Sequence, residues 1–165
     1  MVRERAIIMK IRLASSSDAS AVANLIFQSF LEYKSSYTDE AFAATCPSSI
    51  EVENRISEGP IWTAIEDETV VGTVSGVPVG NALLVRSLAV LPSERGQGTG
   101  ELLLDRVENY AHENGYTRLV LSTTPFLTPA IRLYEQFGFQ RSSEGPSDRL
   151  GTPIFTMVKE LKSKQ

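Results

Sequence analysis

The sequence predicts a mixed α/β or α+β fold. Through the second half of its 165 residues, short β-rich runs alternate with stretches whose apolar residues recur at helical spacing. An apolar run over residues 83–91 leads into a glycine-rich loop, and an amphipathic helix pattern follows the loop. Hydrophobic residues make up 42% of the chain and charged residues 22%, which is ordinary for a globular protein, and we expect one domain over residues 1–165.

The first half is predicted to contain strands and two helices. The patterns predict, in order, a strand over 6–13, a helix over 19–33, a short helix that starts after Ser48 and ends near Gly59, strands over 61–65 and 69–77, and the strand over 83–91. Residues 15–18 supply caps for the first helix, and Ser48 with Glu51 has the spacing of a capping box for the second. The polar turn 66–68 between two β-rich runs indicates a hairpin.

The second half is predicted to alternate helices with strands. The patterns predict, in order, a helix that follows the glycine loop and ends at Gly115, a strand over 119–121, a helix from Thr128 to Gly138, and a last strand over 154–158. Thr128 has the position of an N-cap, followed by Pro129 in the first helical position. Residues 159–164 have the composition of a solvated tail.

The glycine-rich loop has the chemistry of an anion site. Three glycines within five residues let the backbone turn tightly and bring its N–H groups close to a ligand, and the helix that follows adds unpaired N–H groups and the positive end of its dipole. The phosphate loop of nucleotide triphosphatases is absent, and the dinucleotide fingerprint fails because Glu101 stands where its third glycine belongs. The spacing that fits is Arg95-x-x-Gly98-x-Gly100.

This spacing is the acyl-CoA signature R/Q-x-x-G-x-G/A of the GCN5-related N-acetyltransferase (GNAT) superfamily, which the chain resembles. Residues 87–92 resemble the family's fourth strand, and residues 130–139 resemble its later motif A-x-x-L-Y-x-x-x-G-F. The resemblance is strong over residues 82–140 and extends to the whole chain. It implies a GNAT fold: a central mixed, mostly antiparallel sheet of six to seven strands with splayed fourth and fifth strands, flanked by about four helices.

The resemblance also implies the site residues and a co-substrate, acetyl-CoA. The implied diphosphate ligands are Arg95, Gly96, Gln97, Gly98, Thr99 and Gly100. The backbones of Leu88, Ala89 and Val90 are expected to bind the pantetheine arm, a form of β-augmentation, and the Val90 N–H is expected to polarise the thioester carbonyl. Tyr134 is expected to lie near the sulfur and to give a proton to the departing thiolate.

Two positions depart from the family pattern. Many members carry a glutamate base where this chain has Ser87, so the general base is open between Glu32, Tyr33 and a chain of water molecules. Members often carry an asparagine where this chain has Leu127, and Thr124 or Thr128 is the candidate to replace that contact with CoA.

Composition and residue inventory exclude several other functions. The net charge of −4 argues against sequence-independent nucleic-acid binding, and no apolar run approaches the length needed to span a bilayer. The only histidine, His112, falls on a polar helix face where we expect it to be solvated, and one histidine with one cysteine, Cys46, provides neither a catalytic dyad nor a usual zinc site, so no metal is expected. A single cysteine makes the cytoplasm the expected location.

The sequence therefore predicts an acetyl-CoA-dependent N-acetyltransferase. An amine is expected to attack acetyl-CoA directly in a ternary complex, with the primary-amine acceptor, a small molecule or peptide, lying between the first helices and the loop over 142–152. The acidic chain hints at a cationic acceptor such as a polyamine or basic peptide. Two alternatives stay open: a non-catalytic acyl-CoA-binding or regulatory module, and a protein N-terminal or lysine acetyltransferase. Dimers are common in the family, so a homodimer also stays open.

Overall fold

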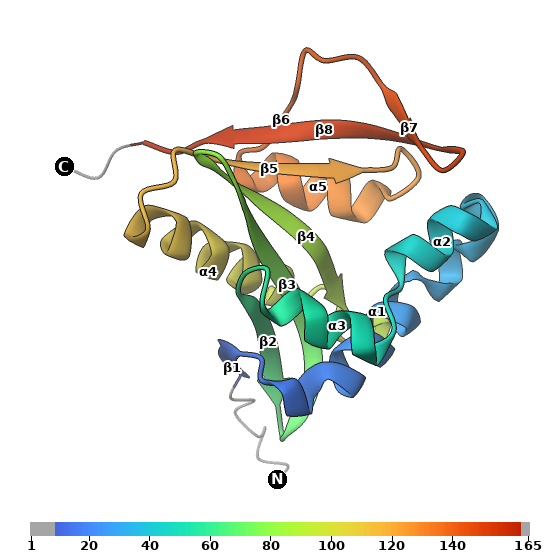
Figure 1. Cartoon of the computed structure of the whole chain (residues 1–165), viewed down its shortest axis with the longest axis vertical. Helices are drawn as coiled ribbons and strands as arrows, with labels where there is room; N and C mark the ends of the chain where they lie inside the picture. The colour runs from blue at the N-terminus through green and yellow to red at the C-terminus, as the bar shows by residue number, and fades with distance from the viewer. Residues whose placement is uncertain (1–8, 163–165) are drawn as a thin grey trace, which may run out of the picture.

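The computed structural model describes residues 9–162, which form one sheet with helices on both faces (Figure 1). The strands are β1 (Met9–Leu13), β2 (Ile61–Glu66), β3 (Thr69–Val79), β4 (Ala82–Val90), β5 (Arg118–Thr123), β6 (Gln140–Arg141), β7 (Ser147–Arg149) and β8 (Thr152–Glu160). The α-helices are α1 (Ala19–Phe30), α2 (Asp39–Thr45), α3 (Ser49–Ile56), α4 (Thr99–Glu113) and α5 (Thr128–Phe137). Three short 3₁₀ helices complete the list: η1 (Ser16–Asp18), η2 (Leu31–Ser36) and η3 (Pro92–Glu94).

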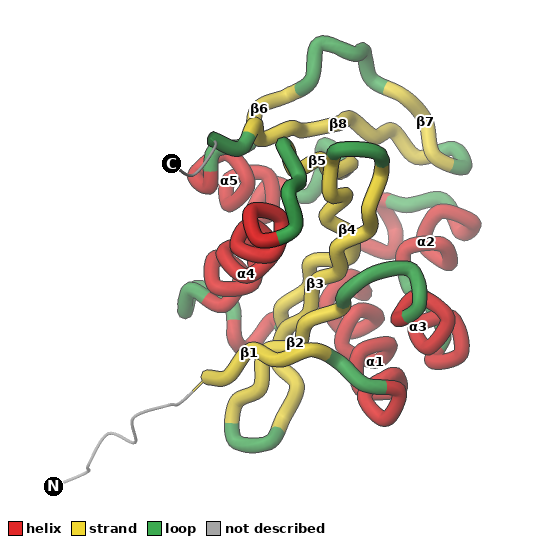
Figure 2. Tube along the Cα trace, turned by 60° about the vertical axis from the view of Figure 1, so that its left-hand side comes forward, coloured by secondary structure: helices red, strands yellow, loops and turns green. Residues whose placement is uncertain are grey.

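The strands run in the order β1-β2-β3-β4-β5-β8-β6, and β7 pairs with β8 beside this path. Every pairing is antiparallel except that of β4 with β5. Helices α4 and α5 cover one face of the sheet, while α1, α2 and α3 lie on the other (Figure 2). The mixed, mostly antiparallel sheet of the GNAT fold is thus confirmed, with β6 and β7 as two short additions.

The sheet splays open between β4 and β5. These strands pair only through Ala82–Leu84 and Arg118–Val120, and beyond Leu84 the two strands separate, as Figure 1 shows. A bulge in β4 accompanies the separation: the register with β3 shifts by one residue between Thr73 and Ser75, and Ser87 takes a left-handed φ of 56°. The splayed fourth and fifth strands are confirmed.

The hydrophobic core lies between α4 and the sheet. Its fully buried large side chains come from β2, β4, α4, β5 and β8 and include Trp62, Leu83, Leu103, Leu119 and Met157. Burying each such side chain stabilises the fold by roughly 1.5–3 kcal/mol. A second cluster around Val22, Ile26 and Val52 packs α1 and α3 on the opposite face.

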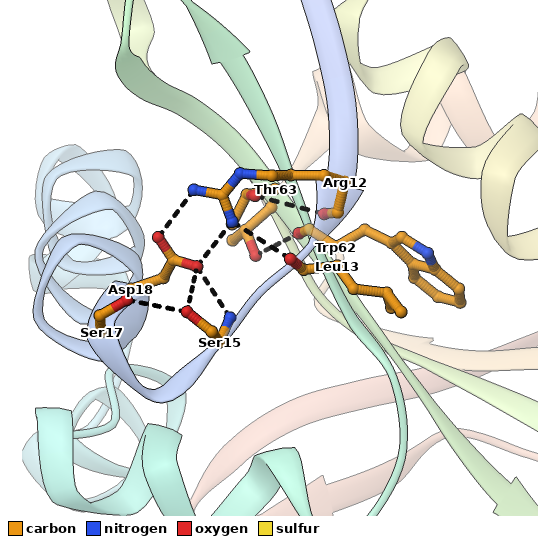
Figure 3. Close-up of polar contacts among 8 residues, drawn as sticks. Arg12, Leu13, Ser15, Ser17, Asp18, Trp62 and Thr63 are labelled. Carbon is orange, nitrogen blue, oxygen red and sulfur yellow. Dashed lines mark hydrogen bonds and ion pairs between the residues drawn. The ribbon is translucent and has the colours of Figure 1, made fainter.

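A polar cluster joins β1 to the start of α1 (Figure 3). The Arg12 guanidinium donates two hydrogen bonds to the Asp18 carboxylate, at 2.7 and 2.9 Å, and the Ser15 N–H donates a third at 2.8 Å. The hydrogen bonds from Arg12, against a smaller opposing effect of burial, hold the pKa of Asp18 at about 2. The Ser15–Asp18 box caps the 3₁₀ helix η1, whereas the predicted side-chain cap of α1 is wrong, because its N-cap Asp18 makes no capping hydrogen bond with α1.

Most predicted elements are confirmed with shifted ends. The predicted first strand begins at Met9, and its residues 6–8 lie outside the described part of the chain. The predicted helix over 19–33 ends as an α-helix at Phe30 and continues as 3₁₀ turns. The capping box of Ser48 and Glu51 is present, but helix α3 ends at Ile56, three residues before Gly59.

Three elements were not predicted from the sequence: α2, β6 and β7. Helix α2 has only seven residues, fewer than the window of roughly 11–18 residues in which helical periodicity is read, and β6 and β7 have two and three residues without buried side chains. The N-cap assignment of Thr128 is wrong. Leu127 is the N-cap, Thr128 is the first helical residue, and no side chain caps this end.

Two further expectations about solvated residues are wrong. His112 is largely buried, with 16% of its side chain exposed, because it packs beside Glu108 with its Nε2 3.8 Å from the carboxylate. Lys159 belongs to β8, not to a solvated tail. Its Nζ donates to Glu108 at 3.1 Å and lies 4.1 Å from the centre of the Phe137 ring.

Candidate active site

A cavity of about 370 Å³ opens where β4 leaves β5. Its walls are the end of β4, the loop that follows, the first turn of α4, the first half of α5 and the end of α1. All the sequence-predicted site residues except Gln97 line it: Leu88, Ala89, Val90, Arg95, Gly96, Gly98, Thr99, Gly100 and Tyr134. Gln97 lies on the exposed side of the loop.

The glycine loop presents free backbone donors to this cavity. Gly96 and Gly98 have φ of 82° and 83°, a left-handed conformation that favours glycine, and a Cβ atom at either position would meet nothing within 4 Å. Gly98 is the N-cap of α4, so the N–H groups of the first helical turn have no carbonyl partner within the helix. The Thr99 hydroxyl is buried there and has no hydrogen-bond partner among the described residues. These features suit a phosphate-bearing ligand.

The Val90 N–H faces the open edge of β4. The next N–H along the strand, that of Leu91, bonds to the Val71 carbonyl of β3 at 2.9 Å. Because successive backbone groups of a strand alternate between its two edges, we infer that the Val90 N–H points toward the side from which β5 has splayed away. The Val90 carbonyl, on that same edge, accepts a hydrogen bond of 3.1 Å from the Ser29 hydroxyl of α1.

The Arg95 side chain turns away from the loop and ties it to α1. It forms an ion pair with Glu32 and donates to the Ser29 carbonyl at 2.9 Å. The predicted positive charge therefore lies beside the cavity, but it is shared with a carboxylate. The same pair occupies Glu32, one of the predicted general bases.

Tyr134 lies where the large cavity meets a smaller one. Its side chain is 8% exposed, and its hydroxyl makes no hydrogen bond with any described residue. Burial, and secondarily the neighbouring Tyr37, raises the pKa of Tyr134 above the ordinary tyrosine value. At neutral pH the hydroxyl is thus a protonated donor with no competing partner.

The smaller cavity, of about 90 Å³, lies on the other side of Tyr134. The two cavities share Phe30, Leu88, Leu127 and Tyr134 as walls. The remaining walls come from α2, β5, β7, β8 and the residues that follow η2 and β5, and they include Tyr37, Thr124, Arg149 and Thr152. This cavity lies between the first helices and the segment over 142–152, where the acceptor is expected, and its use by an acceptor stays a prediction.

Polar and aromatic groups surround the smaller cavity. The Thr123 hydroxyl is buried without a partner among the described residues. Burial raises the pKa of Tyr37 to about 12, so this phenol is also protonated at neutral pH. Its ring packs edge-on against Phe126, and Phe126 lies beside Tyr33.

Of the two positions that depart from the family pattern, Leu127 lines the cavities and Ser87 does not. Ser87 sits at the bulge, and its hydroxyl accepts a hydrogen bond of 3.2 Å from the Arg55 guanidinium. Leu127 lines both cavities, Thr124 lines the smaller one, and Thr128 lines neither.

Cys46 is half-buried, and burial raises its pKa to about 11, which disfavours the reactive thiolate.

Three residues in or beside the site could not have been identified from the sequence alone. Ser29, Arg55 and Arg149 come from α1, α3 and β7, and none belongs to a motif. Their contacts depend on how distant segments pack. A spacing pattern within the chain gives no signal for them.

Most of the chain matches a known protein family. Residues 21–139 match the family described as Acetyltransferase (GNAT) family. The chain belongs to this family. GNAT membership agrees with the motifs, the splayed sheet and the glycine loop described above.

Relatives of this GNAT chain carry N-acetyltransferase names. The uncharacterized N-acetyltransferase YhfO of Bacillus subtilis is 30% identical over 141 residues, which cover 82% of this chain and 92% of YhfO. The mouse protein named probable N-acetyltransferase family 8 member 5 is 38% identical over 94 residues, which cover 53% of this chain and 41% of that protein. The match therefore spans only about two-fifths of this mammalian relative.

Solved GNAT structures share the fold at low sequence identity. The PaiA N-acetyltransferase of Thermoplasma acidophilum, in complex with coenzyme A, has a TM-score of 0.79 at 20% identity, covering 93% of this chain and 99% of that one. YncA of Salmonella typhimurium, a putative acetyltransferase with its cofactor acetyl-CoA, has a TM-score of 0.74 at 19% identity, covering 94% and 95%. Within residues 9–162, no helix is long and apolar enough to cross a membrane, and no group of three or more potential metal ligands occurs.

Proposed function

We propose that this protein transfers the acetyl group of acetyl-CoA to an amine within a ternary complex. The observation that carries the proposal is the convergence of three donors on one cavity: the first turn of α4, the open edge of β4 at Val90, and the Tyr134 hydroxyl. The loop donors suit the diphosphate, and the splayed strand offers an unpaired edge to the pantetheine arm. The coenzyme A complexes of GNAT structural neighbours support this use of the cavity.

The proposed reaction uses two protein groups, the Val90 N–H and the Tyr134 hydroxyl. The neutral amine attacks the carbonyl carbon of the thioester, a C–N bond forms, and the C–S bond breaks. The Val90 N–H stabilises the negative charge that develops on the carbonyl oxygen. The sulfur leaves as a thiolate and takes a proton from Tyr134, which regains one from water.

The amine proton is proposed to leave through water. No carboxylate occupies the Ser87 position, and Glu32 is held by Arg95. Tyr33 lines the large cavity and stays an alternative acceptor of this proton. The lack of a dedicated carboxylate also keeps the non-catalytic CoA-binding module as the rival function.

Ligand-dependent melting and thiol release test the proposal together. At 100 times its Kd, acetyl-CoA should raise the free energy of unfolding by roughly 2.7 kcal/mol, and hence the melting temperature, while ATP and NAD should not. Release of free coenzyme A in the presence of an amine panel would then establish transfer. Stabilisation by acetyl-CoA with no thiol release from any amine would favour the rival module, and no stabilisation would reject the site.

Other features of the protein remain predictions. We propose one domain over residues 1–165, a cytoplasmic location, a small-molecule or peptide acceptor, and no nucleic-acid partner. Size-exclusion chromatography with light scattering would decide between a monomer and a homodimer.

A further inference from the structure

Arg55 lies near two arginines from other elements, Arg86 and Arg149. Arg55 belongs to α3, Arg86 to β4 and Arg149 to β7. Arg86 neighbours Ser87 in the β4 bulge, and Arg55 donates to the hydroxyl of that serine. Arg149 lines the smaller cavity together with Tyr134. Of the three side chains only Arg149 lines a cavity, and Arg55 contacts Ser87, the residue before the cavity-lining Leu88.

Only one of these three charges is neutralised by an ion pair among the described residues. Arg86 donates to Glu58 at 2.9 Å. Arg55 is half-buried, and its one recorded hydrogen bond goes to the neutral Ser87 hydroxyl. Arg149 has no carboxylate within 4 Å in residues 9–162, since the adjacent Asp148 instead accepts from the Gly151 N–H at 2.8 Å. Arg149 thus brings to the smaller cavity a positive charge that no carboxylate among the described residues pairs with.

Arg55 is half-buried, whereas Arg149 is exposed. Burial first, and then the like charges of Arg86 and Arg149, lower the pKa of Arg55, while Glu58 and Glu51 oppose this. Glu51 is itself engaged with the Ser48 N–H in the capping box of α3. An anionic ligand beside Arg149 offsets the repulsion among these like charges.

We propose that the acceptor is an amine that also carries a carboxylate, of the amino-acid class, and that Arg149 binds the carboxylate. This inference rests on the proposed acetyltransferase function. Guanidinium groups match carboxylates with paired hydrogen bonds, and the buried Thr123 hydroxyl offers a further polar contact in the same cavity. The local charge thus favours the opposite acceptor class from the polyamine that the net charge of −4 suggests.

A matched ligand series separates the carboxylate from the amine. Alanine, methionine, leucine and phenylalanine are each compared with their amides and with the amine that lacks the carboxylate. Binding is measured by calorimetry to the protein saturated with coenzyme A, and transfer by thiol release, with rates corrected to the neutral amine. We expect the best amino acid to exceed both of its analogues by tenfold or more in affinity and in kcat/KM.

Substitution of Arg149 assigns the contact. Arg149→Gln should lower affinity and kcat/KM for the amino acid at least tenfold and leave those of its amide unchanged, while melting stabilisation by acetyl-CoA persists. Arg118→Gln, at the far end of β5, removes the same charge from an exposed position and should change neither the affinity nor the kcat/KM for the amino acid.

The outcomes distinguish the inference from the proposed function. Equal or better binding of the amides, or failure of every amino acid to bind the coenzyme A-loaded protein, overturns the carboxylate site whatever the enzyme acetylates. Selective binding of amino acids without any thiol release supports the carboxylate site and rejects the acetyltransferase proposal.

Discussion

At the scale of single residues, Tyr134 best separates catalysis from binding. It lies between the two cavities with a free, protonated hydroxyl. We predict that Tyr134→Phe lowers kcat by about 10²-fold, the lower end of general acid catalysis, because the thiolate loses its proton donor. Stabilisation by acetyl-CoA should persist in a melting experiment.

A matched control is available for this substitution. Tyr110→Phe removes a hydroxyl from a ring that packs against Trp62, away from both cavities. It should leave kcat unchanged. An unaltered kcat in Tyr134→Phe would remove Tyr134 from the mechanism.

Glu32 provides the second test at this scale. Its carboxylate pairs with the half-exposed Arg95 side chain, and we attribute to it the positioning of the loop. Glu32→Gln should therefore change kcat by no more than about fivefold, the size of an exposed ion pair, and should leave the pH dependence of kcat unchanged. Loss of the limb of the pH profile that reports a general base would instead identify Glu32 as that base.

At the scale of elements, the glycine loop can be tested through its backbone conformation. Gly98 needs a left-handed φ of 83°, which costs a residue with a side chain about 1–2 kcal/mol, although there is open space for the added methyl group. Gly98→Ala should thus destabilise the fold by about that amount. It should also weaken acetyl-CoA binding, because the added methyl group lies on the loop that is proposed to bind the ligand.

The turn between β3 and β4 supplies the control for the loop. Gly80 has φ 59° and similarly open surroundings, but it lies away from the cavities. Gly80→Ala should show the same loss in chemical denaturation and normal affinity for acetyl-CoA. Equal affinities in both variants would argue against a binding role for the loop.

The junction of β1 and α1 predicts a dependence of stability on pH. The native pKa of Asp18 is about 2, below its ordinary value of 3.8, so its contribution is present at neutral pH and is lost as the pH falls from about 4 to 2. Because half of the Arg12 side chain is exposed, we expect Asp18→Asn to lower the free energy of unfolding by only about 1 kcal/mol at pH 7.

Denaturant unfolding at two pH values measures this difference. The gap between the native protein and Asp18→Asn should close near pH 2, where the native carboxylate also takes up a proton. A gap that is independent of pH would show that the charge of Asp18 is not what stabilises the junction.

At the scale of the whole molecule, stability depends on the packing of α4 against the sheet. Leu103 is fully buried and lies over Gly72 of β3, whereas the adjacent Leu102 is 46% exposed. Leu103→Ala should lower the free energy of unfolding by about 2–5 kcal/mol through lost burial and a cavity. Leu102→Ala should have a much smaller effect, and similar losses from both would contradict the packing described.

The confirmed predictions come from features that are local in the chain. The capping box of α3, the hairpin of β2 and β3 and the amphipathic pattern of α4 each depend on residues within a few positions of one another. The elements that were missed, α2, β6 and β7, are too short to show a period. They exist because β8 and the neighbouring segments hold them in place.

The candidate site likewise has parts that are local in the chain and parts that depend on tertiary packing. The sequence by itself determined the family and predicted a phosphate-bearing ligand for the glycine loop, since glycines before a helix free the backbone N–H groups locally. Only the tertiary structure decided that Arg95 pairs with Glu32, 63 residues away, and that Arg55 meets Ser87, 32 residues away. These contacts depend on how α1, α3 and β7 pack around the splayed strand, and charges brought together by packing leave no periodic pattern in the chain.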